Sequence, residues 1–262
     1  MASSSDPPAR SGTQSIERAV LLLRELAARG HAGWGLRDLA RHCELDRATV
    51  YRMLRCLVQE RLVLQRASDR RYLIGPLNFE LGISVPHQAA LADAARTAVR
   101  RLARQFRQVV SLAYLRSDDD CVCIARAGSS SYTSEGTAIR VGHRAPLLSL
   151  AGGIAILAAL PAEQARAVAA RNHRRLLHLG TAHLARAATL LRASERKGLV
   201  LSPGVVWQGI HSVAAGFGPA GAPVGSLVVS GSGADYPAEA LRRLLPEVQA
   251  AAESILARPP AG

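Results

Sequence analysis

Apolar residues recur every three or four positions in three successive segments near the N-terminus. The first segment follows Ser15, which is placed to cap a helix, and ends at Gly30. The second covers residues 36–43, and the third runs from Asp46, another predicted cap, to about residue 59. Because this spacing puts apolar side chains on one face of a helix, the pattern predicts three amphipathic helices.

Two short runs with a period near two follow the third helix. Residues 62–65 and 71–74 are β-like and surround a polar turn at 67–70, which predicts a hairpin. Three helices followed by a hairpin are the elements of a winged helix-turn-helix. We therefore expect this domain over residues 15–75, after a disordered tail at 1–14 that is rich in Ser, Pro and Gly.

The pattern changes beyond Pro76, where helical and strand-like segments alternate. Strands joined by polar turns, with helices between them, predict an α+β domain with a largely antiparallel sheet. Pro246 is expected to interrupt the last helix. We place a linker helix at 76–90 and the α+β domain at 91–262. The expected strands are 109–116, 121–127, 137–141, 211–217 and 224–231, and the expected helices are 77–83, 88–106, 151–160, 162–177, 184–197 and 238–257.

Arginine dominates the charge of the chain. The formal net charge is +13 at pH 7, and Lys197 is the only lysine. Such an excess favours anionic partners, nucleic acid before acidic lipid. A coding bias that replaces lysine with arginine would produce the same excess, so charge alone does not identify a partner.

Composition also indicates where the protein works. No apolar run approaches the roughly 20 residues that span a bilayer, and the first residues lack the apolar stretch of a secretory signal. The cysteines fall at helix or strand positions and do not form a disulfide framework. We therefore expect a cytoplasmic protein with no membrane partner. These cysteines are Cys43, Cys56, Cys121 and Cys123.

The third predicted helix has two contrasting faces. One is an apolar stripe that includes Val50, Leu54 and Leu57, and the opposite face is basic, with no acidic residue between Arg47 and residue 59. A solvated face would normally mix both signs. Arginine can bond guanine edges bidentately, and Thr or Tyr hydroxyls can reach phosphate oxygens. This face therefore predicts a DNA-binding helix, with a solvated helix of an unrelated domain as the alternative. Its residues are Arg47, Thr49, Tyr51, Arg52 and Arg55.

Several motifs carry a resemblance to a known family. They are "TVYR" at 49–52, "RYLIG" at 71–75, "VGHRAPLLSLAGGIAILAALP" at 141–161, "GIHSVAAGF" at 209–217 and "GSLVVSG" at 225–231. Over residues 15–257 the sequence resembles the IclR family of bacterial transcription regulators. The resemblance implies a winged helix that binds operator DNA, followed by a GAF-like domain that binds a small-molecule effector. It also implies a homo-oligomer, either a dimer or a dimer of dimers.

The resemblance extends the expected sites beyond the third helix. Wing arginines would lie against phosphate or the minor groove, and small residues would line an effector pocket, although they would equally allow close helix–sheet packing. The expected DNA-binding residues are Arg37, Arg47, Ala48, Thr49, Tyr51, Arg52, Arg55, Arg66, Arg70 and Arg71. The expected effector-binding residues are Leu148, Ser149, Ala151, Gly152, Gly153, Ser212, Ser230 and Ser232.

The sequence departs from the family pattern at four places. Glu44 and Arg61 stand where glycine is common, which predicts a left-handed backbone at both. The usual acidic residues after Lys197 are absent, and Ser212 replaces a frequent cysteine. The last two departures argue against a keto-acid effector and leave open a different ligand or none.

Three short motifs match catalytic or metal-binding patterns by their letters, but the predicted elements around them do not fit those functions. "GFGPAG" at 216–221 contains a proline and precedes a strand, so it cannot cradle a phosphate. "SERK" at 194–197 closes a helix, and the "CVC" cysteines lack a second ligand pair of zinc spacing. We therefore expect no enzyme, metal or cofactor. The rival classes are an architectural, sequence-indifferent DNA-binding protein and a small-molecule hydrolase or transferase.

Overall fold

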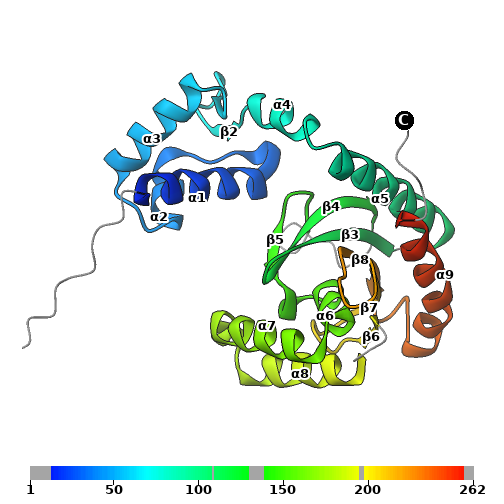
Figure 1. Ribbon diagram of the computed structural model, residues 1–262. Coiled ribbons are helices and arrows are strands. Elements are labelled where there is room, and N and C mark those ends of the chain that lie inside the picture. Colours follow the sequence, from blue (N-terminus) through cyan, green and yellow to red (C-terminus); the bar gives the residue numbers. More distant parts are fainter. Residues whose placement is uncertain (1–12, 108, 130–138, 195–197, 257–262) are drawn as a thin grey trace, which may run out of the picture. The chain divides into compact units, whose positions relative to one another are not determined.

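The computed structural model describes residues 13–107, 109–129, 139–194 and 198–256 (Figure 1). The chain divides into two compact units, one ending at Ser84 and one beginning at Val85. This division falls inside the segment expected as a linker helix at 76–90. Most of the tail expected at 1–14 lies outside the described residues.

The first unit contains the expected three helices and hairpin. Thr13, and not Ser15, is the N-cap residue of the first helix, while Asp46 caps the third as expected, because its Oδ2 accepts a hydrogen bond from the Thr49 amide at 2.9 Å. The elements are α1 (Gln14–Arg29), α2 (Leu36–His42), α3 (Arg47–Gln59), β1 (Val63–Gln65), β2 (Tyr72–Ile74) and α4 (Leu77–Ile83).

A small apolar core holds this unit together. Leu22 and Leu26 of α1 pack with Leu39 of α2 and Leu54 of α3, and all four side chains are fully buried. The left-handed backbone predicted for Glu44 and Arg61 is confirmed, with φ angles of 53° and 60°.

The second unit is built on one antiparallel sheet, which confirms the α+β prediction. Among the described residues the strand order is β5-β4-β3-β8-β7-β6. Three details differ from expectation. The described part of the strand expected at 137–141 forms no strand, and neither the three-residue strand β5 nor the five-residue strand β6 was predicted. The strands are β3 (Val109–Ser117), β4 (Asp120–Gly128), β5 (Arg144–Pro146), β6 (Leu199–Pro203), β7 (Ile210–Phe217) and β8 (Gly225–Ser232).

Helices cover both faces of this sheet (Figure 1). One face packs against α5 (Pro86–Gln105) and α9 (Ala238–Leu256), and the other packs against α6 (Ala151–Ala159). Further out, α6 packs against α7 (Ala162–Arg175) and α8 (Thr181–Ser194). Pro246 does not interrupt α9, contrary to expectation. It lies on the exposed side of that helix, where water can hydrate the carbonyl that loses its N–H partner.

Candidate functional sites

The α3 helix presents most of the predicted DNA-binding residues on one exposed face. Its opposite side is anchored in the core by Val50, Leu54 and Leu57. The exposed positions are Arg47, Ala48, Tyr51, Arg52 and Arg55, while Thr49 is half-buried beside the cap. Arg37 is exposed on α2.

The cap at Asp46 fixes where this face begins. The Thr49 amide is the main reason that the pKa of the Asp46 carboxyl lies below its usual range, and the positive charge of Arg52 lowers it further. Asp46 precedes the helix, and α3 itself carries no acidic side chain, so the positive field of its arginines is not cancelled along its length. Such a helix can bond phosphates and guanine edges.

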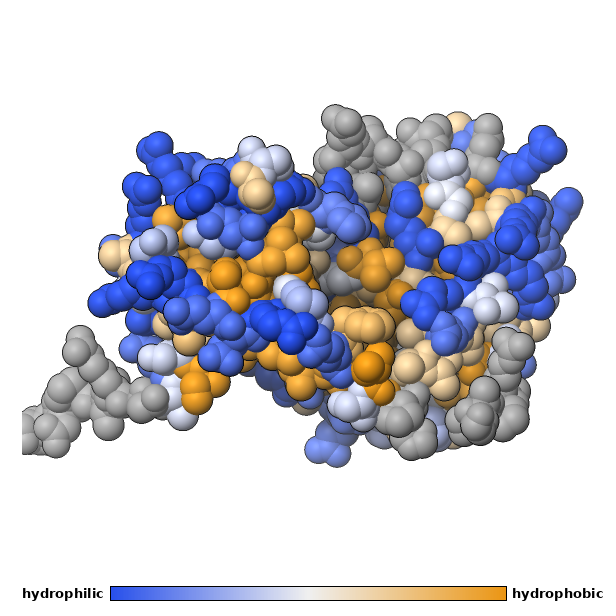
Figure 2. Space-filling view, turned by 90° about the horizontal axis from the view of Figure 1, so that it is seen from above, coloured by the Kyte–Doolittle hydropathy of each residue, from blue (hydrophilic) through white to orange (hydrophobic). Residues whose placement is uncertain are grey.

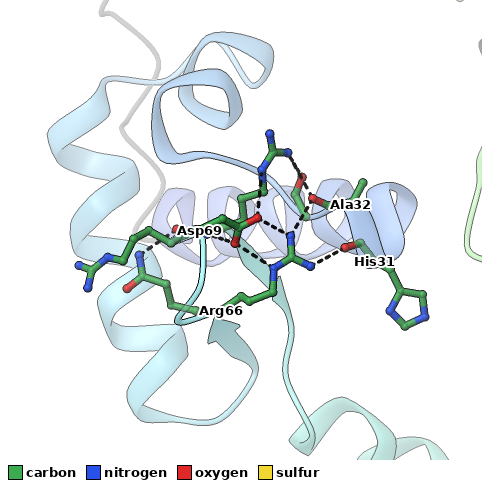
Figure 3. Close-up of polar contacts among 8 residues, drawn as sticks. His31, Ala32, Arg66 and Asp69 are labelled. Atoms are coloured by element: carbon green, nitrogen blue, oxygen red, sulfur yellow. Dashed lines mark hydrogen bonds and ion pairs between the residues drawn. The ribbon is translucent and has the colours of Figure 1, made fainter.

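The wing is the hairpin of β1 and β2, and its three arginines, Arg66, Arg70 and Arg71, differ in their contacts; Figure 3 shows those of Arg66. Arg66 donates from Nε and Nη2 to the carboxylate of Asp69, at 2.8 and 2.6 Å, and from Nη1 to the carbonyl of His31 at 2.9 Å. Arg71 is also bonded within the protein, and Arg70 is exposed. All three were expected to lie against phosphate or the minor groove. In the structure Arg66 and Arg71 are bonded within the protein, whereas Arg70 is exposed.

A cavity of about 410 Å³ lies in the second unit between α6 and the sheet. Four of the predicted effector-binding residues line it, and so do several residues that were not predicted from the sequence. Most of its lining is apolar, and the described lining residues include no Lys, Arg, Asp or Glu. The predicted lining residues are Ala151, Gly152, Ser212 and Ser230, and the missed polar or aromatic ones are Tyr114, His143, Ser202 and Trp207.

The other four predicted residues do not line the cavity. The Leu148 amide donates to Asn172 Oδ1 at 2.8 Å, and the Ser149 hydroxyl donates to the Pro146 carbonyl at 2.7 Å. A Cβ at Gly153 would lie 2.0 Å from the Leu147 carbonyl oxygen, so this glycine serves close packing. The remaining residue, Ser232, donates to Asp235 at 2.9 Å, beyond the end of the strand.

Gly152 has both roles considered for the small residues: it allows close helix–sheet packing, and it lines the cavity. A Cβ there would lie 2.7 Å from Val228 Cγ2 and 2.8 Å from Tyr114 Cδ2, so its absence lets α6 approach the sheet. Gly152 nevertheless lines the cavity, and α6 begins beside it without a side-chain cap. The first N–H groups of such a helix have no partner within the helix and can donate to a ligand oxygen.

Hydroxyl groups, the Trp207 indole and the His143 imidazole supply the remaining polar side-chain groups of the cavity. Ser212 Oγ and Ser230 Oγ lie 2.8 Å apart and share a hydrogen bond. The Trp207 indole N–H donates to the Ser149 carbonyl at 3.1 Å, and its ring lies 5.2 Å from that of His183. Burial lowers the pKa of His183, and nearby Arg186 acts in the same direction. Trp207 is 43% exposed, so it forms part of the rim of the cavity.

The cysteines of β4 are buried thiols. Cys121 and Cys123 are both 0% exposed, and burial raises the pKa of each well above its ordinary value. Within the described residues no cluster of His, Cys, Asp and Glu could hold a metal ion. The helices of that part of the chain include none with the length and apolar character of a membrane span.

Comparisons with known protein families match both units. The IclR helix-turn-helix domain matches residues 15–67, and the bacterial transcriptional regulator IclR C-terminal domain matches residues 83–257. Among curated proteins, the HTH-type transcriptional repressor AllR of Klebsiella pneumoniae is 26% identical over 159 residues. That alignment covers 61% of this chain and 57% of AllR, so the match spans little more than half the length of this relative.

Solved structures share the fold over almost the whole chain. An IclR transcriptional regulator from Silicibacter sp. TM1040 has a TM-score of 0.71 and 25% identity, covering 93% of this chain and 95% of its own. An IclR homologue from Microbacterium hydrocarbonoxydans, solved in complex with 4-hydroxybenzoate, has a TM-score of 0.65 and 17% identity. It covers 91% of this chain and 98% of its own.

Proposed function

The chain belongs to the IclR family of bacterial transcription regulators, and on this premise we propose that it binds operator DNA with an affinity that a small-molecule effector changes. The observation that carries the proposal is the exposed basic face of α3, which has no acidic residue along its length. The effector would occupy the cavity of the second unit. A ligand can change operator affinity only if it binds the two arrangements of the protein with different affinities.

Exposed apolar residues of the first unit support a homodimer. Phe79, Leu81 and Ile83 of α4 are 73%, 56% and 59% exposed. Figure 2 shows apolar side chains gathered on the surface of this unit and framed by hydrophilic ones. Such a patch is costly to leave in water, and a second copy of the chain would cover it. In a dimer the two α3 helices would enter major grooves about 10 base pairs apart.

The DNA-binding proposal is tested with two duplexes. Fluorescence anisotropy compares a duplex from the region upstream of the protein's own gene with a scrambled duplex, at about 150 mM salt, where phosphate-only binding is weak. Arg52→Ala or Arg47→Ala is expected to weaken binding to the operator by roughly 1–3 kcal/mol and binding to the scrambled duplex much less. Arg174→Ala, an exposed arginine of the second unit, is the control with the same change in charge.

Equal losses on both duplexes would show that these arginines do not read sequence. An architectural DNA-binding protein is the second candidate, and the net charge of +13 favours it. It would bind both duplexes alike and would not need the cavity. A thousandfold preference for one duplex would exclude it.

The cavity supports an effector with a ring-sized apolar body and a hydrogen-bond acceptor. Its volume lies within the range of roughly 300–1,000 Å³ that small-molecule sites occupy, far more than a keto acid of two or three carbons would fill. The aromatic rings of Tyr114 and Trp207 can cover the body of such a ligand. The start of α6 and the hydroxyls of Ser212 and Ser230 can meet its polar group.

The effector proposal is tested through Trp207 in a Trp34→Phe variant, which keeps one tryptophan. We expect 4-hydroxybenzoate to change the Trp207 emission in a saturable way, and pyruvate to have no effect at the same concentration. The related protein that binds 4-hydroxybenzoate supplies the choice of probe. Binding of pyruvate alone would contradict the proposed ligand class, and a screen of small aromatic compounds without any hit would contradict an effector of this kind.

A further inference from the structure

We propose that Asp69 keeps Arg66 and Arg71 away from DNA phosphates, so that Arg70 is the wing arginine available to DNA. The inference rests on the proposed DNA binding and assigns Asp69 a role in specificity. Phosphate contacts add affinity for every sequence alike. An acid that withholds two arginines therefore lowers non-specific binding without touching the arginines of α3.

Arg66 uses almost all of its donors inside the protein (Figure 3). Two of its nitrogens bind both oxygens of Asp69, and its remaining nitrogen, Nη1, binds the His31 carbonyl. Nη2 also lies 3.5 Å from the Ala32 carbonyl oxygen. Bidentate pairing of this kind is among the stronger hydrogen-bond arrangements in proteins. To meet a phosphate, Arg66 would have to give up the carboxylate and the backbone carbonyls together.

Arg71 is tied to the same carboxylate and the same loop. Its Nη1 donates to the carbonyls of Ala32 at 3.2 Å and Gly33 at 3.1 Å, and its Nε lies 3.5 Å from Asp69 Oδ2. Asp69 Oδ1 also accepts a hydrogen bond from the Arg71 amide at 3.2 Å. One carboxylate therefore faces two arginines, and Arg66 is the main cause of the lowering of its pKa to about 2.

The loop that receives these arginines is fixed to the wing by backbone bonds. Trp34 and Tyr72 exchange two hydrogen bonds, at 3.0 and 2.8 Å. Gly33 makes this approach possible, because its φ is 60° and a Cβ there would lie 3.0 Å from the Tyr72 carbonyl oxygen. The Trp34–Tyr72 pairing, which we call the wing root, thus stays in place without the Asp69 contacts. Variants at Asp69 therefore act mainly on the side chains of the turn between β1 and β2.

Arg70 is oriented differently from its two neighbours. Its backbone is left-handed, with a φ of 60°, and is held there by bonds from the Arg70 amide to the Arg66 carbonyl and from Gln65 Nε2 to the Arg70 carbonyl. The side chain is exposed. The side chains of Arg66 and Arg71 are 36% and 41% exposed, but their guanidinium groups are engaged within the protein. Arg70 is therefore the wing arginine that can meet DNA without breaking such contacts.

The test is the salt dependence of binding to a random duplex, measured with the full chain. A lysine or arginine that neutralises one phosphate contributes about −0.9 to the slope of log K against log salt. We expect Arg70→Ala to make the slope shallower by about 0.9, and Asp69→Ala to make it steeper by about 0.9 for each arginine released, up to about 1.8. Adding Arg66→Ala to Asp69→Ala should return about half of that gain.

Two further variants separate release of the arginines from other effects. Glu60→Gln removes an exposed carboxylate of the same unit and changes the net charge equally, so it should steepen the slope much less than Asp69→Ala. Asp69→Asn keeps the shape of the side chain and should shift the slope in the same direction as Asp69→Ala. Trp34 emission reports whether the wing root is intact in each variant, because Trp34 pairs with Tyr72.

An unchanged or shallower slope in both Asp69 variants, with normal Trp34 emission, would overturn the inference while leaving DNA binding in place. An equal steepening by Glu60→Gln would also overturn it, because general charge would then explain the result. If the wild-type protein shows no salt-dependent binding to any duplex, the proposed function fails, and this inference fails with it.

Discussion

Each unit of the protein contains one tryptophan beside a histidine, yet the two rings have different surroundings. Trp34 stacks on His42 with ring centres 5.0 Å apart, and Arg29 lies 4.4 Å from the centre of its ring. Trp207 lies 5.2 Å from His183 and borders a cavity of about 410 Å³. The first ring contacts α1 and the end of α2, and the second forms the edge of a cavity.

The comparison shows that the functional residues proposed for the two units lie in different environments. In the first unit the core is small, and the residues proposed to act are exposed charges on α3 and the wing. In the second unit they line a cavity, and all of them except Trp207 at its rim are buried or half-buried, so their positions depend on packing. Substitutions that change charge should therefore act mainly on DNA binding by the first unit. Substitutions that change packing should act mainly on the stability and ligand binding of the second unit.

The largest effect is expected from Asn172→Ala. Asn172 is fully buried, accepts from the Leu148 amide at 2.8 Å and donates to the Asp119 carbonyl at 2.9 Å. Its loss leaves the Leu148 amide without this partner and opens a small cavity, while the Asp119 carbonyl keeps the Leu147 amide at 3.1 Å. The substitution should lower the free energy of unfolding of the second unit by roughly 2–4 kcal/mol. Urea denaturation followed by Trp207 emission in the Trp34→Phe background measures it.

A matched asparagine in the first unit supplies the control for that comparison. Asn78 donates to the carbonyls of Leu62 and Gly75 at 2.7 and 3.0 Å, but it is only half-buried. Because water can replace its bonds, Asn78→Ala should cost clearly less. Equal losses at the two positions would contradict the distinction between the units.

Gly152→Ala should destabilise the second unit by roughly 1–3 kcal/mol, because the added methyl overlaps Val228 and Tyr114. The same methyl should weaken binding of an aromatic ligand in the cavity. Thermal denaturation and titration of Trp207 emission measure the two effects. An unchanged stability would mean that α6 can move away from the sheet without cost.

Gly82→Ala should have the opposite sign. This glycine lies in α4, and a Cβ there would meet nothing within 4 Å. Alanine should therefore stabilise the helix by roughly 0.5–1 kcal/mol. The measurement is the denaturation midpoint of the first unit, followed by Trp34 emission in a Trp207→Phe variant; destabilisation would show that α4 needs its glycine for another contact.

The smallest effect is expected from pH, since it involves a single proton. Burial lowers the pKa of His183 below 6.5, so below that pH the unfolded chain binds a proton that the folded unit excludes. The free energy of unfolding of the second unit should therefore be highest, as far as His183 is concerned, above about pH 6.5. It should decline as the pH falls from there towards the lower pKa of His183 in the folded unit. His183→Gln should reduce this dependence, and an identical pH profile in the variant would assign it to another group.

Local sequence determined most of the first unit. The period of 3.6 located α1, α2 and α3, and the Asp46 cap is a contact within four residues of chain. The basic face of α3 follows from spacing along one helix, so no distant residue is needed to define it. The left-handed backbone at Glu44 is likewise a property of a short turn.

Only the tertiary structure decided the cavity and the state of the wing. Tyr114 is far from Ser202 and Trp207 in the sequence, and it meets them because β3, β6 and the segment after β6 fold around the start of α6. Arg66 has its acid three residues away, but the His31 carbonyl that also holds it comes from 35 residues earlier. Periodicity records which face of an element is apolar, whereas contacts between distant segments depend on how those faces pack together.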